Sequence, residues 1–168
     1  GGTAIETYSG HVWIAKNATI TYSAPGSVSD FSAANGGGNF TSGDSYLKVK
    51  YTMGINANGF LWLIGDSSVN YISGVQTSGT PITTTFSNLN ADPEVGSPYP
   101  ASVETFGRDV LFANDYGVHV VNGSNVVKIS EPLDGVWNTV ASFGGIQLAS
   151  SKMTIFGKKV WMFLLPVI

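Results

Sequence analysis

The sequence repeats itself at an interval of 49 or 50 residues, and each repeat contains a pair of short apolar segments with the character of β-strands. The equivalent positions Val12, Leu61, Val110 and Val160 are separated by 49, 49 and 50 residues. Fixed intervals of about 40 to 50 residues with about four strands per unit are typical of the blades of β-propellers, because a single blade cannot cover its own apolar faces. The repeat therefore predicts stacked sheets rather than one closed core.

We expect an all-β fold, namely a single β-propeller fragment over residues 1–168, built from four-stranded antiparallel blades with about three blades and the start of a fourth. Propellers typically have four to eight blades, so this number does not close a ring. We therefore expect part of a larger protein or a homo-oligomer, because the apolar run Val160 to Ile168 predicts uncovered blade surface. The approximate repeats are 1–50, 51–99, 100–149 and 150–168.

Composition excludes several classes of function. The net charge of −3 provides no basic patch, so we expect no direct sequence-specific binding of nucleic acid. No cysteine is present, which removes disulfides, thiol catalysis and structural Cys-zinc sites. No run of about 18 apolar residues occurs, so we expect no membrane partner. The 21 glycines fit an all-β chain with many turns.

Turn residues keep the same interval as the strands. Asx side chains at the first corner of a turn accept backbone N–H bonds, so an Asn or Asp that recurs between two apolar segments predicts a turn there. Glycines recur where the following strand is expected to end. The predicted structural turns are at Asn17, Asp66, Asp115, Gly74 and Gly123.

A fourth strand in each repeat is predicted around Phe31, Phe86 and Ile129, although its spacing drifts. Two long connections, residues 33–44 and 88–100, are expected to lie at the blade rim. Length variation of this kind is typical of surface loops, which carry most binding functions. We therefore expect these loops to contact partner proteins.

Large apolar side chains recur at one position of the repeat, where they are predicted to fill the space between blades. The predicted blade-core residues are Trp13, Trp62, Leu111 and Trp161. Aromatic and polar residues in these two connections and in a third one, residues 131–145, are instead candidates for partner contacts, since isolated aromatics often anchor interfaces. These candidates are Trp137, Tyr99 and Asn39.

Catalytic patterns are weak in this sequence. His11 and His119 lie on predicted strands, outside any Gly-x-Ser-x-Gly nucleophile motif. Glu6 and Glu104 occupy equivalent repeat positions, which indicates repeat symmetry before a pair of catalytic carboxylates. The loop acids lack the spacing of a calcium loop. We expect no enzyme activity, no cofactor and no metal.

The middle of the chain, roughly residues 55 to 140, resembles the packaged-DNA stabilisation or tail-hub proteins of short-tailed bacteriophages. The residues that carry the resemblance include Asn58 to Ser73, Asn90 to Pro98 and Lys128 to Val136. The resemblance implies a structural, non-enzymatic propeller in the tail or neck of the virion. Such a hub helps to close the portal, retains packaged DNA and binds other tail and portal-adaptor proteins. No catalytic residue is implied by these motifs.

Two other functions fit the residues. In a glycan-binding or glycan-cleaving propeller, Trp137, Tyr99 and loop acids would line a shallow pocket. The chain would otherwise be a secreted repeat protein of the adhesin kind. Clustered exposed aromatics beside two acids would favour the glycan function, whereas a broad polar rim would favour the structural one.

Overall fold

The computed structural model describes residues 2–42, 51–137 and 152–163. Its fold is all-β, with three four-stranded antiparallel sheets and one two-stranded sheet. This architecture confirms the expected fold class at the level of repeated four-stranded sheets. In every sheet, neighbouring strands are also consecutive in the sequence, so each sheet is a meander of hairpins.

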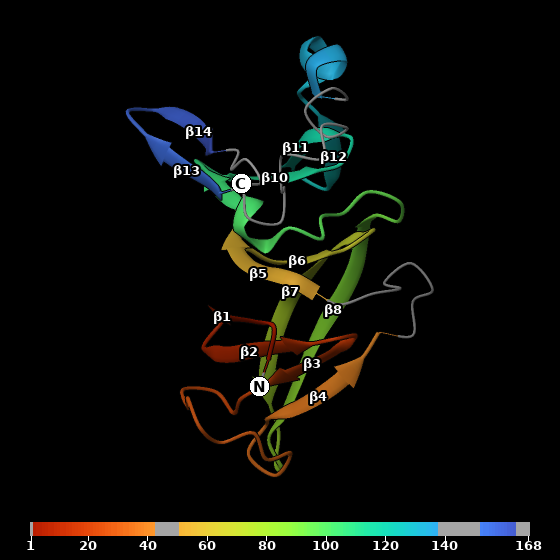
Figure 1. The fold of residues 1–168 in the computed structure, drawn as a ribbon. Helices are drawn as coiled ribbons and strands as arrows, with labels where there is room; N and C mark the ends of the chain where they lie inside the picture. The colour runs from red at the N-terminus through yellow and green to blue at the C-terminus, as the bar shows by residue number, and fades with distance from the viewer. Residues whose placement is uncertain (1, 43–50, 138–151, 164–168) are drawn as a thin grey trace.

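Each sheet falls within one of the sequence repeats, and Figure 1 shows the sheets following one another from the red N-terminal strands to the blue C-terminal hairpin. Sheet 1 contains β1 (Ala4–Tyr8), β2 (His11–Lys16), β3 (Thr19–Tyr22) and β4 (Gly38–Thr41). Sheet 2 contains β5 (Tyr51–Ala57), β6 (Phe60–Gly65), β7 (Val69–Ser78) and β8 (Thr83–Asp92). Sheet 3 contains β9 (Glu104–Phe106), β10 (Asp109–Asn114), β11 (Gly117–Asn122) and β12 (Asn125–Lys128). Sheet 4 contains β13 (Lys152–Phe156) and β14 (Lys159–Phe163).

Helical structure among the described residues is limited to short turns. The 3₁₀ turns are η1 (Pro100–Ser102) and η2 (Glu131–Leu133), and residues 134–137 continue as a helical turn. Both 3₁₀ turns carry proline in their first two positions, where its missing N–H is tolerated.

The first hairpin of every sheet closes with a two-residue turn that contains left-handed backbone. The first turn residues are Ser9, Asn58, Gly107 and Gly157, with φ of 51°, 54°, 66° and 59°. Two-residue hairpins need positive φ because their twist must match that of the strands. These turns are separated by 49, 49 and 50 residues, so the backbone follows the same repeat as the sequence.

In three of these four hairpins, a tryptophan side chain forms a hydrogen bond across the hairpin. Trp13, Trp62 and Trp161 each donate an indole N–H bond to the backbone carbonyl five residues earlier, at 3.0, 3.1 and 3.2 Å. Each of those carbonyls belongs to the last residue before the turn. The third sheet has Leu111 at this position, so its side chain supplies packing without a hydrogen bond.

The sheets stack face to face, and the second strand of each sheet presents alternate side chains to its two faces. We call the face that packs on the following sheet the forward face and the face that packs on the preceding sheet the backward face. Side chains alternate between these faces because successive residues of a strand point to opposite sides. Forward positions are Trp13, Trp62, Leu111 and Trp161, and backward positions are Val12, Leu61, Val110 and Val160.

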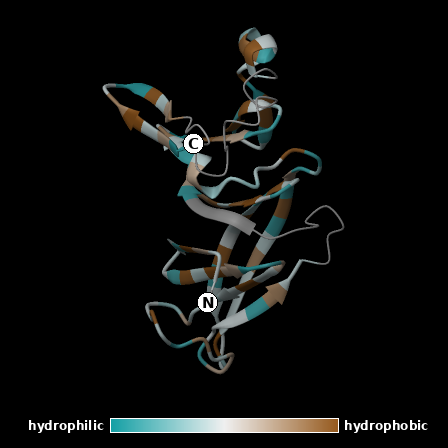
Figure 2. Ribbon diagram, viewed as in Figure 1, coloured by the Kyte–Doolittle hydropathy of each residue, from teal (hydrophilic) through white to brown (hydrophobic). Residues whose placement is uncertain are grey.

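Three buried clusters lie between the sheets and follow this rule. Sheets 1 and 2 share Trp13, Ala15, Ile20, Leu61, Leu63 and Ile72. Sheets 2 and 3 share Trp62, Ile64, Val69, Val110, Phe112 and Val121. Sheets 3 and 4 share Leu111, Ala113 and Met153, together with Trp137. The hydrophobic segments lie mainly on the strands, including the β13–β14 hairpin (Figure 2).

Two predictions about the strands are wrong. The first sheet has no strand around Phe31, because its fourth strand is β4, within the connection that was expected to be a rim loop. Pairing with β3 determines this strand rather than its own composition. Gly74 does not end a strand, because β7 continues to Ser78 with a bulge between Ser73 and Gln76. Its φ of 63° is the left-handed backbone that a bulge glycine supplies.

Candidate functional site: two uncovered sheet faces

The forward face of the β13–β14 hairpin is not covered by another sheet among the described residues. Phe156, Trp161 and Phe163 lie on this face and are 76, 48 and 53 % exposed. Trp161 was predicted to be blade core, and its equivalents Trp13 and Trp62 are only 2 and 1 % exposed. The structure therefore places Trp161 at the surface, because no following sheet packs on it.

The backward face of sheet 1 is likewise not covered by another sheet in the part of the chain that the structure describes. Ile5 is 67 % exposed, and Ile14 beside it on β2 is partly buried. Two open hollows lie over this face, with volumes of about 380 and 260 Å³. Ile14 lines both hollows, and Ile5 and Phe31 each line one. This face is thus concave and carries Ile5 and Ile14 together with Lys16 and Thr21, whereas the forward face of the hairpin presents projecting rings.

The proposed partner-contact residues have different environments. Trp137 is predicted to be a partner contact in a long loop, but it is 7 % exposed and packs between sheets 3 and 4. Its indole N–H donates to the carbonyl of Asn114 at 3.2 Å, so it is a core residue. Tyr99 is partly buried and donates its hydroxyl hydrogen bond to Asp115. Asn39 is exposed on β4, opposite Thr21.

The pair Tyr99 and Asp115 also links two connections of sheet 3. Burial and the hydrogen bond to the Asp115 carboxylate, whose charge acts in the same direction, raise the pKa of Tyr99 to about 12. The phenol therefore remains a neutral donor at physiological pH. The carboxylate of Asp115 in the β10–β11 turn thus has a structural partner.

The remaining turn residues lie between strands as follows. Asn17 follows β2 with φ of 55°, so it supplies left-handed backbone to its turn. Asp66 lies between β6 and β7, and Gly123 lies between β11 and β12 with φ of 64°. In the third sheet, the side chain that accepts a backbone N–H two residues later is Asn114, which accepts from Tyr116 at 2.9 Å.

The connection between β3 and β4 is organised by hydrogen bonds. The Asp30 carboxylate accepts from the Ser32 backbone at 2.9 Å and from the Asn35 side chain at 2.6 Å. Hydrogen bonds from the Ser32 side chain, the Asn35 side chain and the Ser32 backbone lower the pKa of Asp30. The Gly36 carbonyl accepts from Thr84 of β8 at 2.6 Å, which joins the connection to sheet 2. The second expected rim loop, residues 88–100, begins inside β8 and leaves it at Asp92. Residues 43 and 44 of the first loop lie outside the described residues.

The candidate catalytic groups are bonded within the fold. Glu6 and Glu104 each accept the backbone N–H of the next residue, at 2.8 and 3.0 Å, which repeats one local geometry. His11 is 2 % exposed, with Nδ1 lying 2.6 Å from the Ser23 carbonyl and Nε2 3.3 Å from the Thr77 hydroxyl. The arrangement connects sheet 1 to sheet 2.

His119 lies between sheets 2 and 3. It is 5 % exposed, and its ring stacks on Phe112 at a centroid distance of 5.4 Å. Burial and then the charge of Lys128 lower the pKa of His119, and the Gly117 backbone and the charge of Asp92 act in the opposite direction. The imidazole is therefore held neutral inside the stack.

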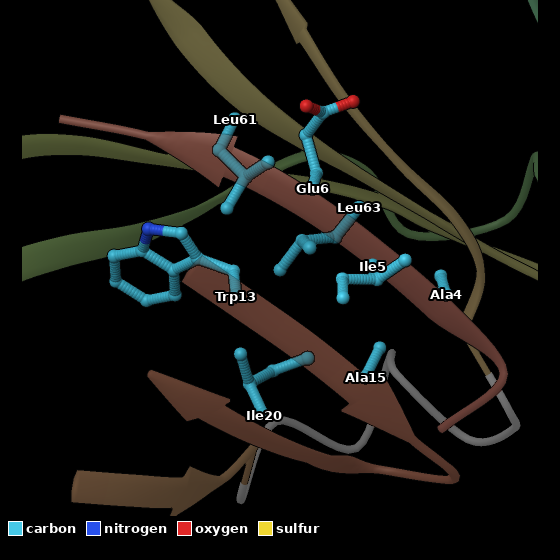
Figure 3. A pocket seen from close by; sticks show the side chains of 8 residues that line it. All are labelled: Ala4, Ile5, Glu6, Trp13, Ala15, Ile20, Leu61 and Leu63. Atoms are coloured by element: carbon cyan, nitrogen blue, oxygen red, sulfur yellow. The ribbon is translucent and has the colours of Figure 1, made fainter. Parts of the chain in front are cut away.

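A small, partly open space between sheets 1 and 2 has a volume of about 10 Å³, which is about the space that one water molecule needs. Figure 3 shows that Trp13, Ile20, Leu61 and Leu63 surround it, while the Glu6 carboxylate points away from the cluster. A space of this size is a packing defect of the core rather than a ligand pocket.

Over the described ranges, no group of three or more His, Asp or Glu side chains could hold a metal ion. No helix in this part of the chain is long and apolar enough to cross a membrane. No protein-family model matches the sequence, and no curated protein is significantly similar to it. The two uncovered faces are therefore the surfaces whose geometry most directly indicates a function.

Proposed function

We propose that this chain is a structural, non-enzymatic β-propeller segment of a bacteriophage tail or neck, where it helps to close the portal and offers attachment surface to other tail proteins. The observation that carries the proposal is the stack itself. Within the residues that the structure describes, the same forward-to-backward contact occurs three times, and no further sheet covers either end face of the stack.

The stack suits a mechanical role for a physical reason. Sheets 1, 2 and 3 each bury the ring or leucine of their forward position against the next sheet, and rigid packing of this kind transmits load through closely packed side chains. Propeller blades cover each other in the same manner, since a ring of blades leaves only short edges. The resemblance of residues 55 to 140 to phage tail hubs supplies the biological setting.

The proposed partners are other phage tail and portal-adaptor proteins, together with further copies of this chain. Asn39 on β4 and Glu94 are exposed and offer polar contacts, and Asp92 beside them at the end of β8 is partly buried. The Asp92 carboxylate already accepts the Glu94 and Val95 backbone N–H groups at 2.9 Å each, so this turn presents a defined shape. Defined loops limit the entropy that is lost on binding.

The glycan-binding alternative loses the residues on which it depended. Trp137 is buried between sheets 3 and 4, and the Tyr99 hydroxyl is bonded to Asp115. Stacking of a sugar needs an exposed aromatic face beside polar groups. The exposed aromatics of the β13–β14 hairpin instead lie where the repeat places another sheet.

The experiment that tests the proposal is localisation in particles. Particles from cells that produce this chain are separated on a density gradient and probed with an antibody raised against the purified chain. We expect the chain in the fraction that contains packaged DNA and antibody label at the tail vertex in electron micrographs. Recovery of the chain only outside DNA-containing particles would show that the proposed function is wrong.

A further inference from the structure

We propose that two copies of this chain associate head to tail, with the forward face of the β13–β14 hairpin of one copy packed on the backward face of sheet 1 of the other. The occupant of each uncovered face is thus the opposite face of a second copy. The pairing concerns these faces alone and does not depend on the assembly that the chain enters.

The contact between sheets 2 and 3 is a template for this pairing. There, the forward residue Trp62 packs in one cluster with Val103 and Phe112 of the backward face of sheet 3. The repeat equivalents of these three residues are Trp161, Ile5 and Ile14. The chain therefore carries both halves of a contact that it already makes internally, but carries them at opposite ends of the stack.

Exposure shows that the two halves are unoccupied in one copy. Val103 is 7 % exposed and its equivalent Ile5 is 67 % exposed, whereas Trp62 is 1 % and Trp161 48 % exposed. Burial of apolar surface contributes about 25 cal/mol per Å², and large aromatic side chains dominate such contacts. Covering the rings of the hairpin and the isoleucines of sheet 1 together is therefore favourable.

The shapes of the two faces also correspond. Phe156, Trp161 and Phe163 project from the hairpin, and the backward face of sheet 1 holds the hollows of about 380 and 260 Å³ over Ile14. In the internal contacts, the forward ring likewise inserts among aliphatic side chains of the next sheet. Self-pairing of either face would oppose rings to rings or hollows to hollows.

Head-to-tail contacts are heterologous, so each pairing leaves one forward and one backward face free. Such contacts continue until a ring closes or an open chain forms. The expected species therefore grows with concentration beyond the 17.6 kDa single chain until closure. The symmetry also permits a test with two variants that each lose one face.

The test measures the solution mass of the full chain by light scattering over a dilution series, for wild type, Trp161→Arg, Ile5→Arg and their equimolar mixture. We expect wild type to associate in a concentration-dependent way. Each variant should associate at least roughly tenfold more weakly, because the substitution replaces a central apolar side chain of the buried contact with a charged one. The mixture should form a complex of two chains, since Ile5→Arg keeps an intact forward face and Trp161→Arg an intact backward face.

The control is Tyr116→Arg, which changes an aromatic residue that is 76 % exposed in the β10–β11 turn and lies on neither face. It should associate like wild type. Circular dichroism checks the fold of each variant, and Phe163→Arg repeats the forward-face test if Trp161→Arg fails to fold. The tryptophan fluorescence of wild type should shift to shorter wavelength as the concentration rises, because association buries Trp161. The other tryptophans, Trp13, Trp62 and Trp137, are already shielded from water in the single chain.

Three results would overturn the pairing. The first is that wild type stays a single chain at every concentration. The second is that Trp161→Arg or Ile5→Arg associates as strongly as wild type. The third is a mixture of the two variants that contains only single chains.

Discussion

Replacement of Trp62 by alanine should be among the most destabilising changes in this chain. The side chain is 1 % exposed, lies in the cluster between sheets 2 and 3, and donates to the Ala57 carbonyl at 3.1 Å. Truncation of a buried Trp or Phe typically costs about 3–5 kcal/mol, because the cavity relaxes only in part. For a chain of this size, about 2–4 °C per kcal/mol applies, so the melting temperature should fall by roughly 6–20 °C.

The matched control is Trp161→Ala, which changes the same repeat position and removes an equivalent bond, to the Phe156 carbonyl at 3.2 Å. Trp161 is already 48 % exposed in the folded chain, so its truncation removes only about half as much buried surface as truncation of Trp62 and leaves no closed cavity. We expect a cost of about 1–2 kcal/mol, from half the usual burial term together with one hydrogen bond.

Urea unfolding followed by circular dichroism compares both variants with wild type, at dilutions where light scattering gives a single chain. Equal slopes against urea are required before the free energies of unfolding are compared. Equal losses at the two positions, or a loss below about 1 kcal/mol at Trp62, would refute the assignment of forward positions to the spaces between sheets.

Two further changes test the stack. The pKa of His119 is lowered from 6.5 in the fold, so His119 takes up a proton on unfolding when the pH is below that value. The melting temperature should therefore be highest above about pH 7 and decline towards pH 5. In His119→Gln that decline should be smaller. In urea unfolding, Gly96→Ala should lower the free energy of unfolding more than Gly59→Ala. A Cβ at Gly96 would meet the Ser68 and Ser67 backbone nitrogens at 2.5 and 2.7 Å. A Cβ at Gly59 would meet no atom within 4 Å, although the φ of 80° there favours glycine. A similar cost at both glycines would contradict the close approach at Gly96.

The sequence allowed the strands of the first hairpins to be predicted because two signals agree there. The apolar segments recur every 49 or 50 residues, and turn residues such as those at Asn58 and Gly107 recur with them. The all-β fold with repeated four-stranded sheets follows from these local signals. Closure into a propeller remains a proposal, because it depends on contacts beyond the four sheets.

The other features depend on distant parts of the chain. The segment that forms β4 is rich in glycine and becomes a strand because β3 offers it a free edge. Trp137 is buried by the Asn114 carbonyl and by Met153, which lie far from it in sequence. The exposure of Trp161 could not be read from its neighbours either, since its own strand resembles those of Trp13 and Trp62. Trp161 differs from them because no sheet within residues 2–42, 51–137 and 152–163 packs on its face.

The meander order of the strands has a consequence for synthesis on the ribosome. Every strand pairs only with its neighbours in sequence, so each sheet can form once its own repeat has left the exit tunnel. The newest sheet would then wait with its forward ring exposed until the next repeat emerges. As the nascent chain grows, each new sheet would thus cover one tryptophan or leucine of the sheet before it. A translation pause between repeats would prolong the time for which that side chain is exposed to chaperones.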